Sequence, residues 1–510
     1  MRSPSSMIAP RQRIPRSIAS TAYDTAWVAS LPDPSDAARP RFPETAAWLA
    51  NNQHADGSWG GAIAYQHDRI ISTLAAIRAI AQFPIQPASR DAIDRGQRYV
   101  WQHAHLLRTE PIELVGFELL LPTLAQAVEA AGVALPPYLD SYAAERARKL
   151  ALIPPDLRYS SQLTLCHSLE FLGRDLDPAQ LARAQGANGS IGNSPAATAF
   201  LLLHDPDNRA ALAYIETCLA SDTSMGVPVL FPCEHFDTLW SAYHRLLGGV
   251  SAQRAITQDQ ADGYERALAG SGICLADTFP IPDADDTAVA ILLLRERGRP
   301  VATSALDSFE RERLYASFAY ERHPSSGVNM HVLDALKRMP PSADRDARVA
   351  KILAFLDEAR IHGTYWIDKW HISPYYATSH ALMALEALDV SPAVDALAEQ
   401  LAAVALDWLR HTQRPDGSWG FFQVGTAEET AYAVLALSRL GSARTSSDRA
   451  ALQRALGFLR RHADDPLPPL WIDKCLYTPS NIVAEVIQSA LRAARRHTAM
   501  LHTSALPIFA

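Results

Sequence analysis

The sequence lacks any run of 18 apolar residues, about the shortest length typical of a membrane-spanning helix. We therefore predict no stable insertion into a membrane. A basic stripe is absent as well: the chain has 47 Lys and Arg against 55 Asp and Glu, its net charge is −8, and neither sign forms a long run. This charge pattern gives no indication of a nucleic-acid partner.

Cysteine is scarce, and no two of the five cysteines have the C-x-x-C spacing of a zinc or redox site. They are Cys166, Cys218, Cys233, Cys274 and Cys475. We interpret them as reduced thiols in a cytoplasmic protein, not as a disulfide framework. Strand patterns are scarce too. Hydrophobic residues make up 48% of the 510 residues, with Ala and Leu dominant, which predicts an all-α fold.

A turn motif is repeated along the chain. Residues 56–60 read Asp-Gly-Ser-Trp-Gly and recur at 416–420, each copy preceded by a Gln, and a weaker copy covers 185–190. An Ala/Leu-rich segment follows each copy. Repeated turns with amphipathic helices predict stacked helical hairpins, which close into α/α barrels. Two strong copies so far apart predict two barrels, with the ligand site in the cleft between them.

Three carboxylates lie within four residues, at Asp283, Asp285 and Asp286, directly after Pro282 and before an apolar run. This pattern is typical of a helix start, where acidic residues suit the helix dipole. Carboxylates this close cannot all ionise in a dry cleft, so at least one should keep its proton near neutral pH. The motif therefore also predicts a general acid.

The order of several motifs resembles one family, the class II diterpene cyclases of the copalyl, halimadienyl and kolavenyl diphosphate synthase type, which are related to squalene–hopene cyclases. The matching segments are 22–29, 48–60, 67–69, 115–118, 149–154, 166–170, 194–200, 227–232, 283–288 and 366–369. The resemblance implies a β domain formed by residues 1–35 and 235–510, with a γ domain, residues 36–234, inserted into it. A third domain that cleaves diphosphates would need a D-D-x-x-D motif. Residues 464–468 lack its final Asp, so we expect no class I α domain and no loss of diphosphate.

The resemblance also implies a reaction and a catalytic acid. The terminal alkene of an isoprenoid diphosphate is protonated, the chain cyclises through carbocations, and a proton is lost. Asp285 would donate the first proton, while Asp283 and Asp286 would orient it. The implied substrate is geranylgeranyl diphosphate, with farnesyl diphosphate and a drimenyl-type product as an alternative. A class I terpene synthase or a phosphatase would act downstream.

Aromatic residues near the predicted acid motif are candidates for the substrate site, with plain core packing as the alternative. Trp366 and Tyr375 are candidates for stabilising the cation through their ring faces, within a wider set that also includes Trp370, Tyr365, Tyr376 and Phe421. By resemblance, Lys369 binds the diphosphate and Glu118 binds Mg²⁺. Lys474 is expected either to assist or to lie on the surface. Arg69 is expected either to bind the diphosphate or to pair with Asp68 or another nearby acid.

The terminating base determines the product. His167 matches the base of the copalyl-type plant enzymes, but Val229 stands where those enzymes have an Asn. Without that polar partner, hydride and methyl shifts continue, and we expect a rearranged halimane- or clerodane-type diphosphate, such as kolavenyl or halimadienyl diphosphate. Another polar side chain in place of the Asn would instead favour plain copalyl diphosphate.

Four other classes of protein share parts of these patterns. An (α/α)-barrel hydrolase can use paired Asp residues, and a non-catalytic helical scaffold would explain the repeats alone. A squalene–hopene cyclase would carry more repeats and an apolar docking patch. A protein prenyltransferase subunit would need a set of zinc ligands that we cannot assemble from this sequence.

Overall fold

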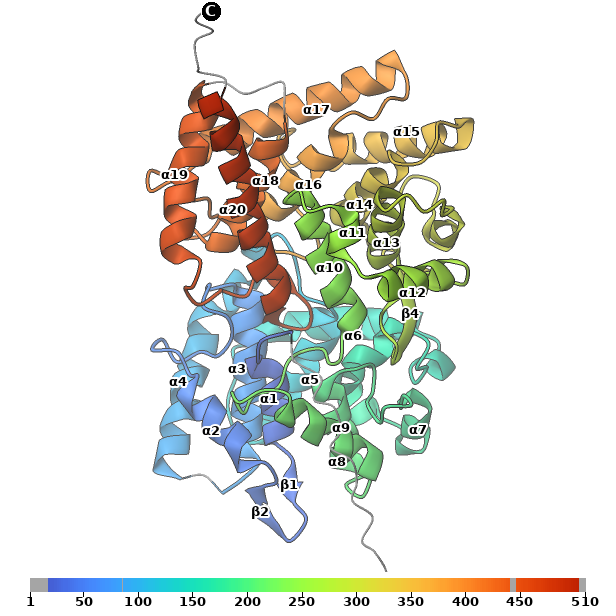
Figure 1. The fold of residues 1–510 in the computed structure, drawn as a ribbon. Coiled ribbons are helices and arrows are strands. Elements are labelled where there is room, and N and C mark those ends of the chain that lie inside the picture. The colour runs from blue at the N-terminus through green and yellow to red at the C-terminus, as the bar shows by residue number, and fades with distance from the viewer. Residues whose placement is uncertain (1–16, 85, 441–445, 504–510) are drawn as a thin grey trace, which may run out of the picture.

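The computed structural model describes residues 17–84, 86–440 and 446–503, except for the side chains of 446 and 497–503. The chain forms two stacked helical units, with α1 to α9 in the lower half of Figure 1 and α10 to α20 in the upper half. No helix in these ranges is both long and apolar enough to cross a membrane. Residues 1–16, which the sequence assigned to the β domain, lie outside the described residues.

The lower unit is a closed ring of five helices with further helices outside it. Each inner helix contacts the next, and the last returns to the first. The inner helices are α1 (Ala22–Ala29), α3 (Gln66–Ala81), α5 (Phe117–Ala130), the 3₁₀ helix η4 (Thr164–Asp175) and α8 (Pro195–His204). The outer ones are α2 (Pro43–Asn51), α4 (Pro87–His103), α6 (Ser141–Leu152) and α9 (Arg209–Ala220).

The upper unit is a second closed ring, of six helices. Its inner helices are α10 (Glu234–Leu247), α13 (Ala284–Glu296), α14 (Ser326–Leu336), α16 (Pro374–Leu385), α18 (Ala427–Arg439) and α20 (Ser480–Thr503). Outside it lie α11 (Ala252–Ala255), α12 (Gln258–Leu268), α15 (Ala343–Glu358), α17 (Pro392–His411) and α19 (Ser446–His462). The prediction of two α/α barrels is confirmed.

Within the described ranges, three short antiparallel hairpins interrupt the helices. They are β1–β2 (Pro32–Asp33 and Asp36–Pro40), β3–β4 (Ile273–Ala276 and Phe279–Asp283) and β5–β6 (Trp471–Ile472 and Leu476–Tyr477). The sequence predicted helices almost throughout, which is confirmed, but it did not locate these hairpins. Two of them position the site, because β4 ends at Asp283 and the turn between β5 and β6 reaches the lower barrel, where Val115 N donates to Asp473 O at 3.0 Å.

The first helix belongs to the lower barrel. The sequence assigned residues 1–35 to the β domain, but α1 packs against α2, α3 and α8, and all eight of its residues are buried. Without α1 the lower ring would be open, so the predicted boundary is wrong for this helix. The segment just before α1 also reaches the upper barrel, where Ser480 N donates to Ser17 O at 2.8 Å.

The repeated turns anchor the helices through their tryptophans. In each, the indole Nε1 donates to the carbonyl ten residues earlier, and the backbone N–H donates to a Thr hydroxyl of the following helix. The indole bonds are Trp59 to Leu49 O (2.8 Å), Trp366 to Leu356 O (2.7 Å) and Trp419 to Leu409 O (2.8 Å). Trp366 is thus a third anchor, fully buried, and its assignment as a lining of the cation pocket is wrong.

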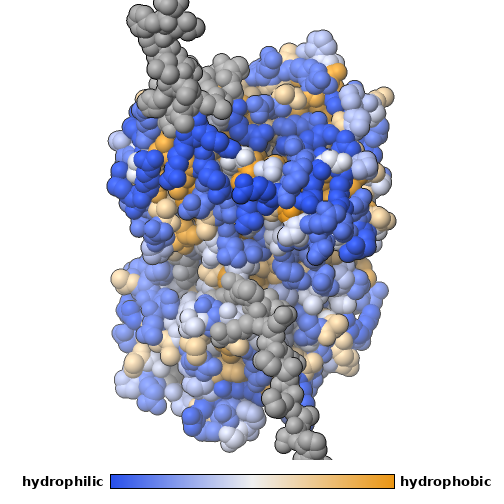
Figure 2. All heavy atoms as spheres, in the orientation of Figure 1, coloured by the Kyte–Doolittle hydropathy of each residue, from blue (hydrophilic) through white to orange (hydrophobic). Residues whose placement is uncertain are grey.

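The face seen in Figure 2 is mostly hydrophilic, with hydrophobic residues in small separate patches. Among the few exposed large apolar side chains are Phe421, which is 41% exposed, and Val424, which is 58% exposed. Phe421 was an aromatic candidate from the sequence. Its exposure separates it from the buried cavity described next.

Candidate active site

A cavity of about 100 Å³ contains the acid motif and is lined by residues of the upper barrel together with Leu230, which precedes α10. Its walls come from α10, α13, the two hairpins β3–β4 and β5–β6, and the segments around Phe318 and Trp370. The rings that line it are Phe236, Trp240, Phe318, Trp370, Tyr376, Trp471 and Tyr477, and its carboxyls are Asp283, Asp285, Asp286 and Asp473. We call it the acid cavity. Of the aromatic candidates from the sequence, Trp370 and Tyr376 line it.

The acid motif is held by the junction of β4 and α13. Asp283 is the last residue of β4 and the N-cap of α13, and its Oδ1 accepts a hydrogen bond from Asp286 N at 2.8 Å. Asp286 Oδ1 accepts from the indole of Trp240 at 2.9 Å. The acidic helix start is therefore structural as well as chemical, since an N-cap Asp satisfies a helix N–H that has no other partner.

The two flanking carboxyls favour the neutral form. Burial, and next the charge of Asp286, raise the pKa of Asp283 well above its usual range. Burial raises the pKa of Asp286 to about 7, although the hydrogen bond from Trp240 acts against it. Neither Oδ2 has a hydrogen-bond partner among the described residues. Both shifts are in the direction of the prediction that at least one of the three keeps its proton near neutral pH.

Asp285 is the most accessible of the three, with 16% of its side chain exposed. His331 Nδ1 lies 2.8 Å from its Oδ1. The other imidazole nitrogen has no partner in the described structure, and the imidazole ring packs edge-to-face against the rings of Trp240 and His380. We therefore assign the proton to Nδ1, which donates to Asp285. The sequence missed His331, because its 46-residue separation from the acid motif gives no local signal.

A second cavity, of about 770 Å³, adjoins the first, and Phe318 and Trp370 line both. It contains Lys369 and Glu118, two residues predicted from separate motifs. Lys369 Nζ lies 2.5 Å from Glu321, and Glu118 forms an ion pair with Lys149. We call it the cation cavity. Sequence analysis missed Glu321 and did not assign Lys149 to the site.

Carboxylates in the cation cavity fit a magnesium–diphosphate complex. Mg²⁺ is commonly held by one or two carboxylates together with substrate phosphates and water. Glu118 and Glu321 supply such carboxylates, and each is already neutralised by a lysine. An arriving diphosphate can take over the lysines and leave the carboxylates to the metal. The residues present therefore fit this ion.

Lys474 does not reach either cavity. It is fully buried, with its Nζ 3.0 Å from Glu170 Oε1, 2.6 Å from Ser194 Oγ and 3.5 Å from Asp24. Its nearest partners come from the lower barrel, so it joins the two barrels. Both of its predicted placements, as a diphosphate ligand and as a surface lysine, are wrong.

Arg69 is also structural. Its guanidinium pairs with Asp56 at 3.3 Å and donates to Ala62 O at 3.2 Å and to Ser58 Oγ. All three partners lie within or close to the first repeated turn. The alternative given by the sequence, a salt bridge to a nearby acid, is correct, and the acid is Asp56, not Asp68.

Two further predicted substrate residues lie outside the cavity walls. The ring of Tyr375 packs at a tilt against Trp408, with ring centroids 4.9 Å apart, and Val229 is fully buried. His167 approaches the acid cavity through another residue: its Nε2 lies 3.2 Å from Oδ1 of Asp473, which lines that cavity.

Comparison with known proteins identifies the family. Residues 319–466 match the model of the squalene-hopene cyclase C-terminal domain. A type B diterpene cyclase of Mycobacterium tuberculosis is 33% identical over 495 residues, covering 93% of this chain and 95% of that protein. The chain belongs to the class II diterpene cyclases. An ent-copalyl diphosphate synthase of a Streptomyces species is 31% identical over 88% of both chains. The solved structure of ent-copalyl diphosphate synthase from Streptomyces platensis matches with a TM-score of 0.76 at 30% identity, covering 94% of this chain and 96% of that one.

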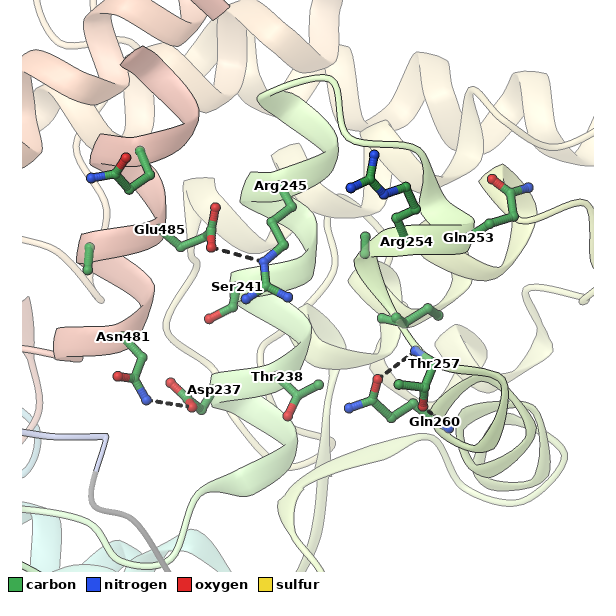
Figure 3. A pocket seen from close by; sticks show the side chains of 14 residues that line it. Asp237, Thr238, Ser241, Arg245, Gln253, Arg254, Thr257, Gln260, Asn481 and Glu485 are labelled. Atoms are coloured by element: carbon green, nitrogen blue, oxygen red, sulfur yellow. Dashed lines mark hydrogen bonds and ion pairs between the residues drawn. The ribbon is translucent and has the colours of Figure 1, made fainter. Parts of the chain in front are cut away.

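Membership of this isomerase-type family excludes the hydrolase and the non-catalytic scaffold as readings of the chain. A third cavity of the cyclase, polar and about 610 Å³ in volume, lies between α10, α12 and α20 (Figure 3). Asp237 and Arg245 of α10 line it and pair with Asn481 and Glu485 of α20. None of the acid-motif residues lines it.

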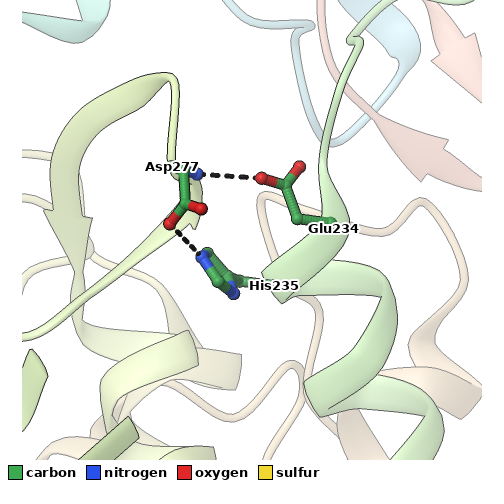
Figure 4. Close-up of side chains that lie close together, drawn as sticks. All are labelled: Glu234, His235 and Asp277. Atoms are coloured by element: carbon green, nitrogen blue, oxygen red, sulfur yellow. Dashed lines mark hydrogen bonds and ion pairs between the residues drawn. The ribbon is translucent and has the colours of Figure 1, made fainter. Parts of the chain in front are cut away.

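A trio of potential metal ligands lies at the start of α10. Glu234, His235 and Asp277 place their ligand atoms within 4.8 Å of one another (Figure 4). His235 Nε2 lies 2.8 Å from Asp277, whose N–H donates to Glu234 at 3.0 Å. Asp277 lies in the turn between β3 and β4. These contacts therefore hold the β3–β4 hairpin, which ends at Asp283, against α10.

Proposed function

We propose that this cyclase converts geranylgeranyl diphosphate into a bicyclic diterpenyl diphosphate by protonation, with the diphosphate retained. The observation that carries the proposal is the pair of adjoining cavities. One holds a carboxyl group among aromatic rings, and the other holds lysines. An isoprenoid diphosphate is an apolar chain with an anionic end, and it matches these two environments in order.

The diphosphate would bind Lys369 and Lys149 in the cation cavity, and the chain would pass Phe318 and Trp370 to bring its terminal alkene to Asp285. The O–H bond of Asp285 breaks, the proton joins the terminal double bond, and a tertiary cation forms. Internal double bonds attack it in turn to close two rings. Because an alkene is a very weak base, the step needs a site closed to water.

Aromatic faces stabilise the cation without reacting with it, and the ring of Trp240 is held in place by its bond to Asp286. His331 orients Asp285 so that the oxygen carrying the proton stays directed to the substrate. Glu118 is the proposed Mg²⁺ ligand, and the ion would neutralise part of the diphosphate charge.

The skeleton of the product follows from the terminating base. The rearranged halimane or clerodane skeleton was inferred from Val229, on the premise that His167 lacks a polar partner. That premise fails, because Asp473 is the partner. The proposed product is therefore a bicyclic diphosphate, and product analysis will show whether it is the copalyl, kolavenyl or halimadienyl isomer. The alternative is a drimenyl-type product from farnesyl diphosphate.

Two further proposals concern the cellular setting. A class I terpene synthase or a phosphatase would consume the product, since the diphosphate remains attached. A cytoplasmic location is proposed from the five cysteines, which carry unbridged thiols.

The test is incubation of the purified chain with Mg²⁺ and geranylgeranyl diphosphate, farnesyl diphosphate or squalene, in parallel. We expect consumption of geranylgeranyl diphosphate and a bicyclic alcohol in the gas chromatogram only after phosphatase treatment. A hydrocarbon or alcohol released without phosphatase would contradict retention of the diphosphate. Turnover of squalene alone would contradict the substrate class.

A further inference from the structure

The acid cavity contains a fourth carboxyl group, which does not come from the acid motif. Asp473 lies in the turn between β5 and β6 and lines the same cavity as Asp285. Its backbone is fixed on both sides, because its N–H donates to Cys475 O and its carbonyl accepts from Val115 N, each at 3.0 Å. The carboxyl is thus held on a rigid turn at the junction of the two barrels.

Asp473 is held in the ionised form. Its Oδ1 lies 3.2 Å from His167 Nε2 and accepts from Lys474 N at 2.6 Å. Burial opposes ionisation, but the charges of His167 and Lys474 outweigh it and lower the pKa of Asp473 below its usual range. Burial likewise opposes the charged form of His167, yet Asp473 raises the pKa of that imidazole. Both imidazole nitrogens face oxygen acceptors, Gly192 O and Asp473 Oδ1, and this geometry suits an imidazolium–carboxylate pair.

The hydrogen bonds of His167 leave it little freedom. Its Nδ1 lies 2.8 Å from Gly192 O, and because a carbonyl only accepts, Nδ1 carries a proton. Nε2 is then the nitrogen that shares a proton with Asp473. The contacts of Asp473 with His167 Nε2 and with Lys474 N both involve Oδ1. Oδ2 is therefore available to a ligand in the cavity.

One cavity thus has two kinds of carboxyl. Burial and neighbouring carboxyls raise the pKa values of Asp283 and Asp286, whereas the basic neighbours His167 and Lys474 lower the pKa of Asp473. Carboxyls whose surroundings drive their protonation apart mark the acid and the base of a reaction. The two kinds come from different elements, α13 and the β5–β6 turn.

We propose that Asp473, positioned by His167, is the base that ends the cyclisation. The proposal rests on the proposed function. A C–H bond next to the final cation breaks, its electron pair becomes the new double bond, and the proton joins Oδ2 of Asp473. One proton enters from Asp285 and one leaves to Asp473, so substrate and product are isomers. The copalyl-type plant enzymes use a water held by an Asn, and this chain has Val229 in place of that Asn. The pair of Asp473 and His167 would take over the role of that water.

The test is the Asp473→Asn variant, assayed with geranylgeranyl diphosphate beside wild type and Asp285→Asn. The amide keeps the bonds from His167 and Lys474 but is not a base. Since general bases typically contribute 10²–10⁴-fold, we expect formation of the wild-type product to fall by at least about 100-fold. Total consumption of substrate should fall far less, with the flux diverted to other double-bond isomers or hydroxylated diphosphates. In Asp285→Asn all consumption should stop.

The exposed Asp464 offers a matched control, since Asp464→Asn makes the same chemical change outside the cavities. Its product pattern should equal that of wild type. An unchanged pattern in Asp473→Asn would overturn the base assignment while leaving the cyclase function intact, and so would a folded Asp473→Asn that consumes no substrate. If wild type itself leaves the substrate untouched, both proposals fail. Should Asp473→Asn not fold, His167→Asn must give the same diversion of products.

Discussion

The Asp286→Asn variant should be more stable than wild type at alkaline pH and less active. Folding raises the pKa of Asp286 from 3.8 to about 7, so the folded state favours the neutral carboxyl. This contribution to stability is complete below pH 3.8 and is lost as the pH rises through 7. A shift of roughly three pKa units corresponds to about 4 kcal/mol. The amide never ionises, and its oxygen can still accept the bond from Trp240.

The assay is thermal unfolding of both proteins at pH 5 and pH 8. With roughly 2 °C per kcal/mol for a large domain, Tm of the variant should exceed that of wild type by about 5 °C or more at pH 8. The gap should shrink strongly at pH 5, where wild-type Asp286 is itself neutral. Cyclase activity should fall at both pH values, because the variant lacks a proton shared within the acid motif.

Asp464→Asn is the matched control and should show the same small change in Tm at both pH values, because Asp464 is exposed. A pH-independent gain for Asp286→Asn would refute the reasoning, since it would show that charge burial is not the cause. A lower Tm at pH 8 would show that Asp286 is ionised and stabilising in the fold.

Three further outcomes are expected. Asp285→Asn should lower turnover by at least about 10³-fold with normal circular dichroism, since the amide cannot donate a proton to carbon; retention of more than a few per cent of activity would place the acid elsewhere. Lys369→Ala and Glu118→Ala should raise KM or weaken the dependence of turnover on Mg²⁺ while the product stays a diphosphate, and unchanged kinetics would remove both from the diphosphate site. Trp366→Phe should lower Tm, because it removes a buried hydrogen bond at a cost of about 1–3 kcal/mol of stability, and it should leave the products unchanged. Trp370→Ala should instead alter the product pattern or the turnover. The reverse result would assign Trp366, and not Trp370, to the stabilisation of the carbocation.

Local sequence sufficed wherever a feature depends on neighbours along the chain. The Asp-Gly-Ser-Trp-Gly turns, the helices that follow them and the N-terminal acids of α13 are set by spacing of a few residues, and all were predicted. Trp366 shows the limit of that reasoning. It lies in a motif associated with the site, yet the helix before it supplies the carbonyl for its indole, and that contact makes it an anchor.

The sequence by itself determined the family, the two barrels and the position of the acid motif, because these depend on residue order and helical periodicity. Only the tertiary structure decided the partners of each charge. His331 reaches Asp285 across 46 residues, and His167 reaches Asp473 across 306. Lys474 and Lys369 occupy equivalent places in similar motifs, yet one is buried between the barrels and the other lines a cavity. The free energy of a charge depends on its distance from other charges and on its exposure to water, and the closing of the two rings sets both.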